Sequence, residues 1–336
     1  MSTLTVCVPV FNAAAFLADT LDTITAQTFT DFKVLISLDR SEDDSEAICR
    51  RYLTDRRFEL IVQPRRLGWV GNVNALIDRV DTPFFCIMPH DDLLAPQYLA
   101  EIYALAASDP AIACAFSDMA GIRGRHHLMF VQDEIRGTPI ERATDFLLNH
   151  FNSVAFRGII RRHGPDDRPH LPTGLRGDFA ADTVWVMRLA LRGELRRLPV
   201  ALYTKRLLKS SVLNTWSRST RAEMLVLWAE QAVASGRMAL EYFKDPQDRE
   251  IILAATWMRT IGKVSKRTAA PTRPSEVAIA AAIFCEAFGD VSVTDGLLAH
   301  PNARHLRTVS ACNALDGTLY PFGERLRLRI RNFFRP

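Results

Sequence analysis

Strand-like and helix-like segments alternate strictly through the first 90 or so residues, and this alternation limits the fold more than any other feature of the sequence. β-Branched and apolar runs occupy residues 4–10, 33–38, 58–62 and 83–88, and segments with helical spacing of apolar residues separate them at 16–24, 44–53 and 71–80. Strands that alternate with helices pair in parallel. The sequence therefore predicts an α/β fold with a mostly parallel sheet flanked by helices.

Polar residues follow three of these strands, so parallel pairing would bring them to one edge of the sheet. Asn12 follows the first strand, residues 39–44 follow the second, and the fourth runs into Pro89-His90-Asp91-Asp92. Open α/β sheets bind ligands at this edge. Two adjacent carboxylates repel each other, and a divalent cation that also holds a diphosphate would relieve the repulsion. The local alternative is that these aspartates cap a helix or a turn, or are solvated.

A dinucleotide-binding Rossmann domain does not fit the first turn. That fold needs glycines between the first strand and helix, so that the backbone can approach a pyrophosphate. Here the turn is Val10-Phe11-Asn12-Ala13-Ala14-Ala15, without glycine, and no Walker-type loop occurs. A nucleotide at this site would be held by side chains.

Composition narrows the class of protein further. At 336 residues the chain can hold one large domain or two smaller ones. No uninterrupted apolar stretch approaches the roughly 20 residues of a membrane helix, and the amino terminus has no secretory signal pattern. The six cysteines lack metal-ligand spacing, which indicates reduced thiols in a cytoplasmic protein. A net charge of +4 is too small to indicate a nucleic-acid partner.

Five short motifs occur in order over about 90 residues. They are Val8-Pro9-Val10-Phe11-Asn12, Gln27-Thr28-Phe29-Thr30-Asp31-Phe32, Leu38-Asp39-Arg40-Ser41-Glu42-Asp43-Asp44-Ser45, the spacing from Gly68 to Asn74, and Pro89-His90-Asp91. In this order they resemble the motifs of the family 2 glycosyltransferases of GT-A fold, of the bacterial cell-surface polysaccharide type. The resemblance covers the amino-terminal half of the chain.

The resemblance implies a set of residues that bind a nucleotide sugar with Mg²⁺ or Mn²⁺. Asp39 would hydrogen-bond the nucleotide base, Arg206 would approach the diphosphate, and Asp91 with Asp92 would hold the metal. The nucleotide-sugar set is Pro9, Phe11, Asn12, Asp39, Asn74, His90, Asp91 and Arg206.

The sequence also departs from the family pattern at four positions. Leu38 replaces the first of two paired acids, and Pro89 replaces the first Asp of the Asp-x-Asp signature. Ala181 replaces a Glu, and Leu208 stands where His is usual after Tyr203 and Arg206. Lys205 or Lys209 could substitute for the missing histidine.

A candidate base lies at the start of a predicted helix. By resemblance, Asp182 matches the Asp that acts as general base in the inverting enzymes, and Asp178 is the alternative. The local alternative is that Asp182 interacts with the helix dipole at the first turn. The preceding Pro/Gly-rich stretch, residues 164–172, predicts a loop that could be a lid or an acceptor wall.

These features predict a metal-dependent, inverting glycosyltransferase that moves a sugar from a nucleotide sugar, with a UDP-sugar expected, to a hydroxyl acceptor. The acceptor would be a glycan or a lipid-linked molecule in surface polysaccharide or glycolipid synthesis. A non-catalytic nucleotide-sugar or glycan-binding protein on the same fold is the alternative. A nucleotidyltransferase fits less well, because no Gly-rich triphosphate loop follows the first strand.

The sequence predicts two parts, a GT-A domain at residues 1–212 and a helical region with a basic tail at residues 213–336. Helix signals include the Thr220–Glu223 capping box and Asp245-Pro246. These helices could cover an acceptor site, mediate homodimerisation or rest on a membrane. Residues 323–336 contain five arginines and one glutamate among apolar residues, which suits either an anionic lipid surface or packing on the protein itself.

Overall fold

The computed structural model describes residues 2–150, 153–208, 219–266 and 274–289, and the chain divides into two compact units. The first unit comprises residues 1–136, 152–174 and 181–211. The second comprises residues 137–151, 175–180 and 212–336. The predicted domain limit at residue 212 lies next to the last of these boundaries, but two earlier segments also belong to the second unit.

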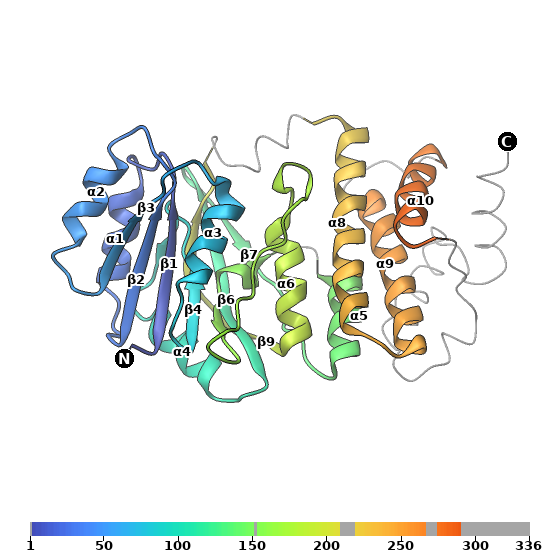
Figure 1. The fold of residues 1–336 in the computed structure, drawn as a ribbon, viewed down its shortest axis with the longest axis horizontal. Helices are drawn as coiled ribbons and strands as arrows, with labels where there is room; N and C mark the ends of the chain where they lie inside the picture. The colour runs from blue at the N-terminus through green and yellow to red at the C-terminus, as the bar shows by residue number, and fades with distance from the viewer. Residues whose placement is uncertain (1, 151–152, 209–218, 267–273, 290–336) are drawn as a thin grey trace. The chain divides into compact units, whose positions relative to one another are not determined.

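The amino-terminal part of the first unit is the predicted alternation of parallel strands and helices (Figure 1). The strands are β1 (Leu4–Val10), β2 (Phe32–Leu38), β3 (Phe58–Val62) and β4 (Phe84–Ile87), and the helices are α1 (Leu17–Thr25), α2 (Ser45–Tyr52) and α3 (Gly68–Asp78). β1 pairs in parallel with β2 and β4, and β2 pairs in parallel with β3. The α/β prediction is confirmed, and the ends of these strands share one edge.

The rest of the first unit extends the same sheet with antiparallel and parallel pairs. Its elements are β5 (Leu93–Leu94), α4 (Tyr98–Ala107), β6 (Ile112–Arg123), β7 (His126–Phe130), η1 (Val154–Arg157), β8 (Ile159–Arg161), α6 (Ala181–Arg192) and β9 (Glu194–Arg206). The strand order is β3-β2-β1-β4-β8-β6-β9-β5, and β7 pairs with β6. β8 is antiparallel to both β4 and β6, so it joins the parallel strands to the β6–β9 ladder.

The core of the first unit is the apolar sheet and the inner faces of its helices. Val6, Val8 and Ile36 are fully buried, as is Trp185 on α6. Burying such side chains contributes about 1.5–3 kcal/mol each. The Trp185 ring packs at 54–69° against Phe85 and Phe156, which ties α6 to β4 and η1.

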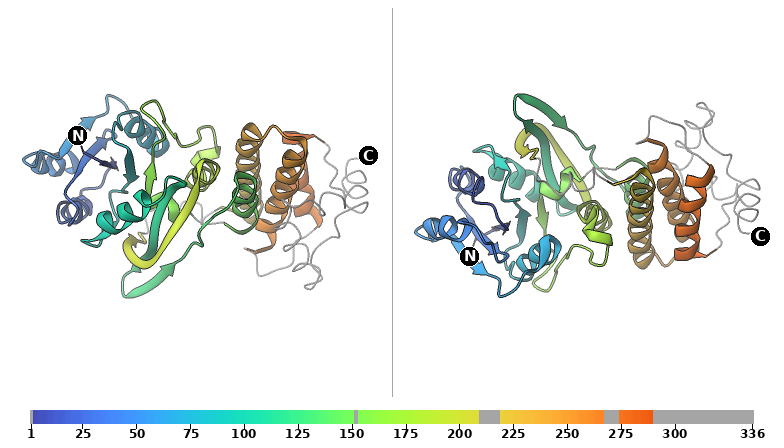
Figure 2. Two further views of the ribbon diagram at one scale, coloured as in Figure 1. Left: turned by 90° about the horizontal axis from the view of Figure 1, so that it is seen from below. Right: turned by 90° about the horizontal axis from the view of Figure 1, so that it is seen from above.

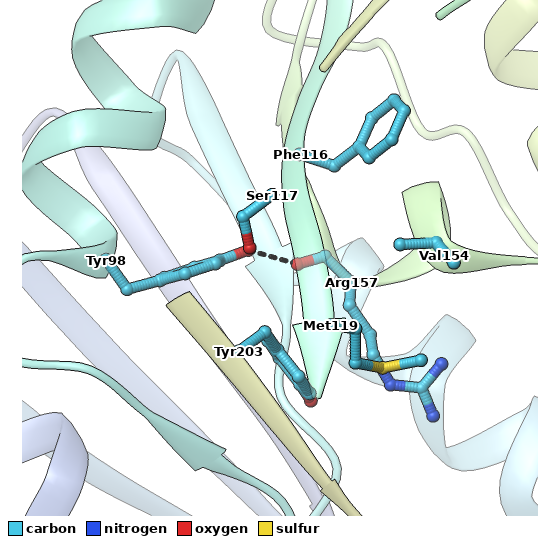
Figure 3. Close-up of a pocket in the computed structure, with 7 residues that line it drawn as sticks. All are labelled: Tyr98, Phe116, Ser117, Met119, Val154, Arg157 and Tyr203. Carbon is cyan, nitrogen blue, oxygen red and sulfur yellow. Dashed lines mark hydrogen bonds between the residues drawn. The ribbon is translucent and has the colours of Figure 1, made fainter. Parts of the chain in front are cut away.

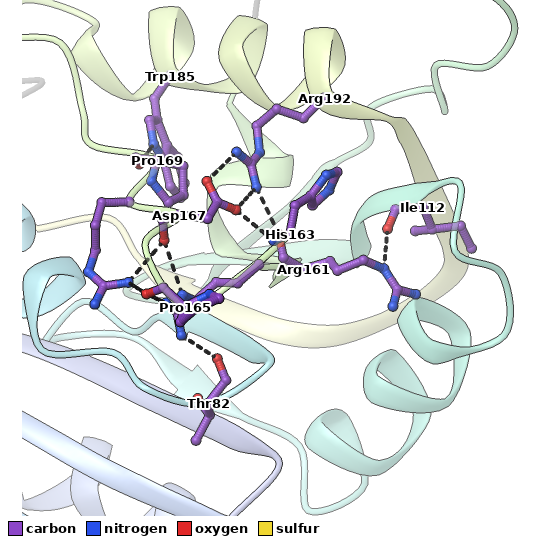
Figure 4. Close-up of polar contacts among 11 residues, drawn as sticks. Thr82, Ile112, Arg161, His163, Pro165, Asp167, Pro169, Trp185 and Arg192 are labelled. Atoms are coloured by element: carbon purple, nitrogen blue, oxygen red, sulfur yellow. Dashed lines mark hydrogen bonds and ion pairs between the residues drawn. The ribbon is translucent and has the colours of Figure 1, made fainter.

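The predicted loop at residues 164–172 is held in place by hydrogen bonds (Figure 4). The Asp167 carboxylate accepts from Arg192 Nη1 at 2.7 Å and from the His163 amide at 2.7 Å. Trp185 Nε1 donates to the Pro169 carbonyl at 2.5 Å. These contacts tie the loop to α6 in this conformation.

The second unit is helical where the structure describes it. Its elements are α5 (Pro139–Asn149), η2 (Arg176–Asp178), α8 (Arg221–Tyr242), α9 (Pro246–Lys266) and α10 (Pro274–Phe288). The predicted Thr220–Glu223 capping box is present, and the Asp245 carboxylate caps α9 by accepting from the Gln247 and Asp248 amides. Arg259, which is 1% exposed, donates from Nη1 to the Phe146, Leu147 and His150 carbonyls at the end of α5.

None of the helices that the structure describes has the length and apolarity needed to cross a membrane. The basic tail, residues 323–336, lies outside the described residues, as does Lys209.

Candidate active site

Side chains hold the glycine-free turn after β1. Asn12 has a left-handed φ of 44°, which asparagine tolerates better than most residues. The backbone N–H of Asn12 donates to Ser41 Oγ at 2.9 Å, and the side-chain Oδ1 of Asn12 accepts from the backbone N–H of Glu42 at 2.9 Å. The Ala14 amide donates to Asp43 Oδ2 at 2.8 Å. The loop after β2 thus supplies the partners of this turn, and the Asn12 oxygen is used within the protein.

Phe11 and Asp39 form a small aromatic and acidic corner with Arg66. Asp39 is 1% exposed; its Oδ1 accepts from the Leu67 amide at 2.6 Å and its Oδ2 from Arg66 Nη1 at 2.8 Å. The Arg66 guanidinium also lies over the Phe11 ring, 3.1 Å from the ring centre. A planar group with N–H donors therefore already stacks on Phe11 and bonds Asp39. Sequence reasoning did not single out Arg66.

Asn74 and His90, both predicted to bind the nucleotide sugar, have partners in the first unit. Asn74 Oδ1 accepts from the Leu171 amide at 2.7 Å, and its Nδ2 donates to the Leu171 carbonyl at 3.1 Å. The oxygen and the nitrogen of the Asn74 side chain thus both bond the 164–172 loop, so the role of Asn74 is to position this loop. His90 Nδ1 lies 3.1 Å from the Pro9 carbonyl. Because a carbonyl only accepts, Nδ1 carries a proton and donates it to this carbonyl.

Asp92 is a buried partner for cations rather than an open carboxylate. It is 1% exposed, and its Oδ2 accepts from Arg157 Nε at 3.1 Å and from the Tyr203 hydroxyl at 2.8 Å. Its Oδ1 accepts from the Arg206 amide at 3.1 Å. Both oxygens are committed, so the geometry does not fit the predicted role of Asp92 as a metal ligand.

Arg157 lies at the end of η1, beside a small cavity (Figure 3). The Tyr98 hydroxyl donates to its carbonyl, and its guanidinium bonds Asp92. Burial acts to lower the pKa of Arg157, but the Asp92 carboxylate outweighs it and raises that pKa. The cavity is lined by Tyr98, Phe116, Ser117, Met119, Val154, Arg157 and Tyr203. Arg157 is therefore a permanent, buried cation at the site.

Asp91 differs from its neighbour because no side chain in the described part of the chain donates to its carboxylate. Burial, and then the charge of Asp92, raise the pKa of Asp91. A cation at this carboxylate would relieve both effects. Mg²⁺ commonly binds one or two protein carboxylates together with substrate phosphates and water. Asp91 fits that donor set, although among the described residues no three His, Cys, Asp or Glu side chains are grouped for a metal.

Two further cations come from the end of β9. Arg206 Nη2 donates to Asp19 Oδ2 at 2.6 Å, and its Nη1 donates to the Asp91 carbonyl at 3.3 Å. Lys205 lies among charged groups: the Arg157 cation first, and burial second, lower its pKa to about 8. Asp92, Asp182 and Asp91 act on the same lysine in the opposite direction. Lys205 therefore lies near all three carboxylates.

Asp182 is the second residue of α6, and donors from Ser153 and Thr183 orient it. The Ser153 hydroxyl donates to Oδ2 at 2.5 Å, and the Thr183 amide donates to Oδ1 at 2.8 Å. The side chain is half-buried. The alternative base, Asp178, belongs to the second unit, and burial raises its pKa. The first unit thus gathers Asp91, Asp182 and Lys205 at the sheet edge.

Comparisons with known proteins agree with this architecture. Residues 5–163 match the family model described as Glycosyl transferase family 2. A curated protein, Glycosyltransferase GlyA of Streptococcus pneumoniae serotype 4, is 25% identical over 100 residues, which are 30% of this chain and 14% of that protein. The alignment therefore spans only a small part of that relative.

Solved structures of glycosyltransferases share the fold. TarS residues 1–349 of S. aureus has a TM-score of 0.62 at 17% identity and aligns with 85% of this chain and 81% of its own. Its complex with UDP-GlcNAc has a TM-score of 0.59 at 15% identity, over 86% and 90% of the two chains. The mannosyltransferase PcManGT from Pyrobaculum calidifontis, in complex with GDP-Man and Mn²⁺, has a TM-score of 0.53 at 17% identity, over 98% and 84%.

Proposed function

Because residues 5–163 match the family model of glycosyl transferase family 2, we propose that the chain transfers a sugar from a nucleotide-sugar donor to a hydroxyl acceptor. The observation that carries the proposal is the grouping of Asp91, without a side-chain donor among the described residues, with Asp182, Lys205 and Arg157 at the carboxyl edge of the sheet. The end of this edge near Phe11 and Asp39 suits the nucleotide base. The end near Asp91 and Asp182 suits the diphosphate and the acceptor hydroxyl.

The hydrogen bonds of Asp39 support a UDP-sugar over a GDP-sugar. Its Oδ1 is committed to the Leu67 amide, which no ligand can displace without moving the backbone. Its Oδ2 bonds only the Arg66 side chain, so this oxygen can exchange partners. Uracil offers one imino N–H, which needs one acceptor, whereas the guanine edge offers two adjacent donors and needs both oxygens. Phe11 would stack on the base once Arg66 leaves.

Asp91 would hold Mg²⁺ or Mn²⁺, which when bound would neutralise charge on the leaving diphosphate. The chain adds its own cations to this end of the site. Arg206 and Lys205 lie close to Asp91, and Arg157 lies behind it, paired with Asp92. These groups would attract and orient the diphosphate even without a metal.

Asp182 would remove the proton of the acceptor hydroxyl as it attacks the anomeric carbon. Ser153 and the Thr183 amide fix the direction of its carboxylate, which a general base requires. One base and a direct displacement give inversion at the anomeric carbon without a covalent intermediate. An acceptor in surface polysaccharide or glycolipid synthesis, used at the cytoplasmic side, agrees with this family assignment.

A second candidate is a nucleotide-sugar or glycan-binding protein without catalysis. Asp92 is bonded to Arg157, Tyr203 and the Arg206 amide instead of being open as a second metal ligand beside Asp91, and this observation favours it. Asp91 and Asp182 separate the two candidates. Catalysis requires a general base near the carboxylate that binds the metal, whereas binding of a nucleotide sugar or a glycan does not.

The proposal is tested by calorimetric titration with UDP and GDP, with and without Mn²⁺, followed by a donor panel in which nucleoside diphosphate release is measured. We expect UDP to bind more tightly than GDP, Mn²⁺ to strengthen UDP binding, and Asp91→Asn to remove the metal effect only. Binding without release of diphosphate from any donor, with an acceptor glycan present, would favour the non-catalytic candidate. No response to either nucleotide would contradict the transferase proposal and the nucleotide-sugar form of the second candidate, and would leave only a glycan binder.

A further inference from the structure

The β6–β7 hairpin exposes apolar side chains on both of its faces. Leu128 is 50% exposed and Met129 is 58% exposed, and Val131 just after β7 is 42% exposed. Neighbouring residues of a strand point to opposite faces, so neither face of this ribbon is fully covered. In both views of Figure 2 the hairpin, drawn in green, extends away from the rest of its unit. Exposed apolar patches of this kind mark interaction sites.

The outer part of the same hairpin carries positive charge and no acidic residue. Residues 119–132 contain no Asp or Glu, and the tip presents Arg123, Arg125, His126 and His127, all exposed. Neither arginine forms an ion pair with another described residue. The nearest acids in the sequence lie at the base of the hairpin and face other arginines: Asp118 accepts from Arg197 at 2.7 and 2.9 Å, the exposed Asp133 lies 3.8 Å from Arg197, and Glu134 pairs with Arg136 and Arg196. The charge of the tip is therefore available to a partner.

An anionic lipid surface matches both properties of the hairpin. Apolar side chains enter the boundary between headgroups and acyl chains, and arginines pair with the phosphates. The outer edge of β7 has no strand partner among the described residues, so a second copy of the chain could also pair there. A second copy would match only the apolar side chains, because each hairpin brings its own positive charge and no acid to meet it.

We propose that the β6–β7 hairpin docks on membranes that contain anionic lipids. The free edge of β7 would face the bilayer, so that Leu128 and Met129 enter the interface from the two faces of the ribbon, and Arg123 and Arg125 contact headgroup phosphates. This proposal does not depend on sugar transfer. It has a consequence for the site, because Gly121 of β6 pairs with Leu128 on one side and Lys205 on the other. Two strand spacings, about 10 Å, separate those residues. A lipid-linked acceptor could then reach the site, a consequence that rests on the proposed function.

Flotation of the full chain with vesicles tests the docking. The vesicles are phosphatidylcholine alone or mixed with phosphatidylglycerol. We expect binding only to the mixed vesicles, and Leu128→Ser with Met129→Ser should weaken it about tenfold or more, because two apolar side chains no longer enter the interface. Arg123→Gln with Arg125→Gln should weaken it by a similar factor, since each charge near an anionic surface contributes about fivefold.

Matched controls remove equivalent groups elsewhere on the first unit. Leu53 and Val62 are 37% and 47% exposed, and Arg51 and Arg56 are exposed arginines away from the hairpin. Leu53→Ser with Val62→Ser, and Arg51→Gln with Arg56→Gln, should bind vesicles like the unchanged chain. Circular dichroism and melting should show that all four variants fold.

Three results would overturn the proposal. The first is no binding of the full chain to mixed vesicles. The second is unchanged binding by both hairpin variants, which would assign the membrane contact to another segment. The third is a change from dimer to monomer in the Leu128/Met129 variant without vesicles, measured by analytical ultracentrifugation, because this would make the hairpin an interface between two copies.

Discussion

The two ends of the candidate site treat their carboxylates differently. At the end formed by β1 and β2, Asp39 is saturated by Arg66 and the Leu67 amide. At the end formed by β4 and α6, Asp91 has no side-chain donor among the described residues, and Asp182 has a neutral hydroxyl donor. At the first end the carboxylate charge is already paired within the protein, so a ligand that binds there must replace one of the partners of Asp39. At the second end the negative charge of Asp91 and Asp182 is not paired with a side-chain cation of the described residues, so it can bind a metal ion or accept a proton.

The same contrast separates the two adjacent aspartates. Asp92 has three donors and stabilises the buried Arg157, whereas Asp91 is destabilised by burial and by Asp92. One residue of the pair thus supports the fold, and the other carries the chemistry in our proposal. The following experiments test this division, in order of expected effect.

Asp182→Asn should lower donor turnover by about 10²–10⁴-fold, because loss of a general base typically costs this much. UDP binding should not change, since Asp182 lies at the acceptor end in our proposal. Asp178→Asn is the matched control and should keep nearly full turnover. Turnover is measured as diphosphate release with an accepted donor. If the Asp178 variant is the inactive one, the base is assigned to the wrong residue.

Asp92→Asn should destabilise the first unit by about 3 kcal/mol, because it leaves the buried Arg157 without its counter-charge. Asp91→Asn should leave the melting temperature unchanged or raise it slightly, since it removes a carboxylate that burial and Asp92 disfavour. Thermal and urea unfolding of the two variants, without metal, measure the difference. Equal destabilisation by both changes would mean that the two aspartates share one structural role.

Arg66→Ala should tighten UDP binding by about tenfold, because UDP no longer has to break the charge-assisted hydrogen bond between Arg66 and Asp39. Arg65→Ala, at the neighbouring exposed arginine, is the control and should bind like the unchanged chain. Calorimetric titration with UDP gives both constants. Weaker binding by the Arg66 variant would show that the guanidinium contacts the nucleotide instead of competing with it.

The part of the site that could be predicted lies in short motifs at strand ends. Strand-helix alternation places Asp39 and Asp91 on one edge, and the resemblance adds Asp182. The partners that decide what each carboxylate can do come from far along the chain. Arg157 is 65 residues from Asp92, and Leu171 is 97 residues from Asn74.

Such pairs leave no local signal, because nothing in residues 153–157 repeats a motif or a spacing. Arg66 is one of two adjacent arginines, and only the path of the loop after β3 selects it. The fold was more predictable than the site for the same reason. Strand and helix patterns are local, whereas the assignment of residues 137–151 to the second unit depends on contacts such as those of Arg259 with the end of α5.

The smallest expected effect concerns the charge at the diphosphate end. Arg157 and burial lower the pKa of Lys205 to about 8, so the lysine is mostly charged at pH 7 and mostly neutral at pH 9. A diphosphate is attracted to the charged form. The dissociation constant of UDP without metal should therefore rise about fivefold from pH 7 to pH 9, which corresponds to about 1 kcal/mol for a partly screened charge pair.

Lys205→Met should bind UDP about fivefold more weakly at pH 7 and lose this dependence on pH. Lys33→Met, which removes a lysine paired with Asp81, is the control and should keep it. Titration is done without Mn²⁺, so that only the cations of the chain act on the diphosphate. A flat profile in the unchanged chain would show that Arg157 and Arg206 suffice at this end. In that case Lys205 would not contribute to diphosphate binding, and the functional charge at this end that the described part of the protein leaves unpaired would be that of Asp91 and Asp182 alone.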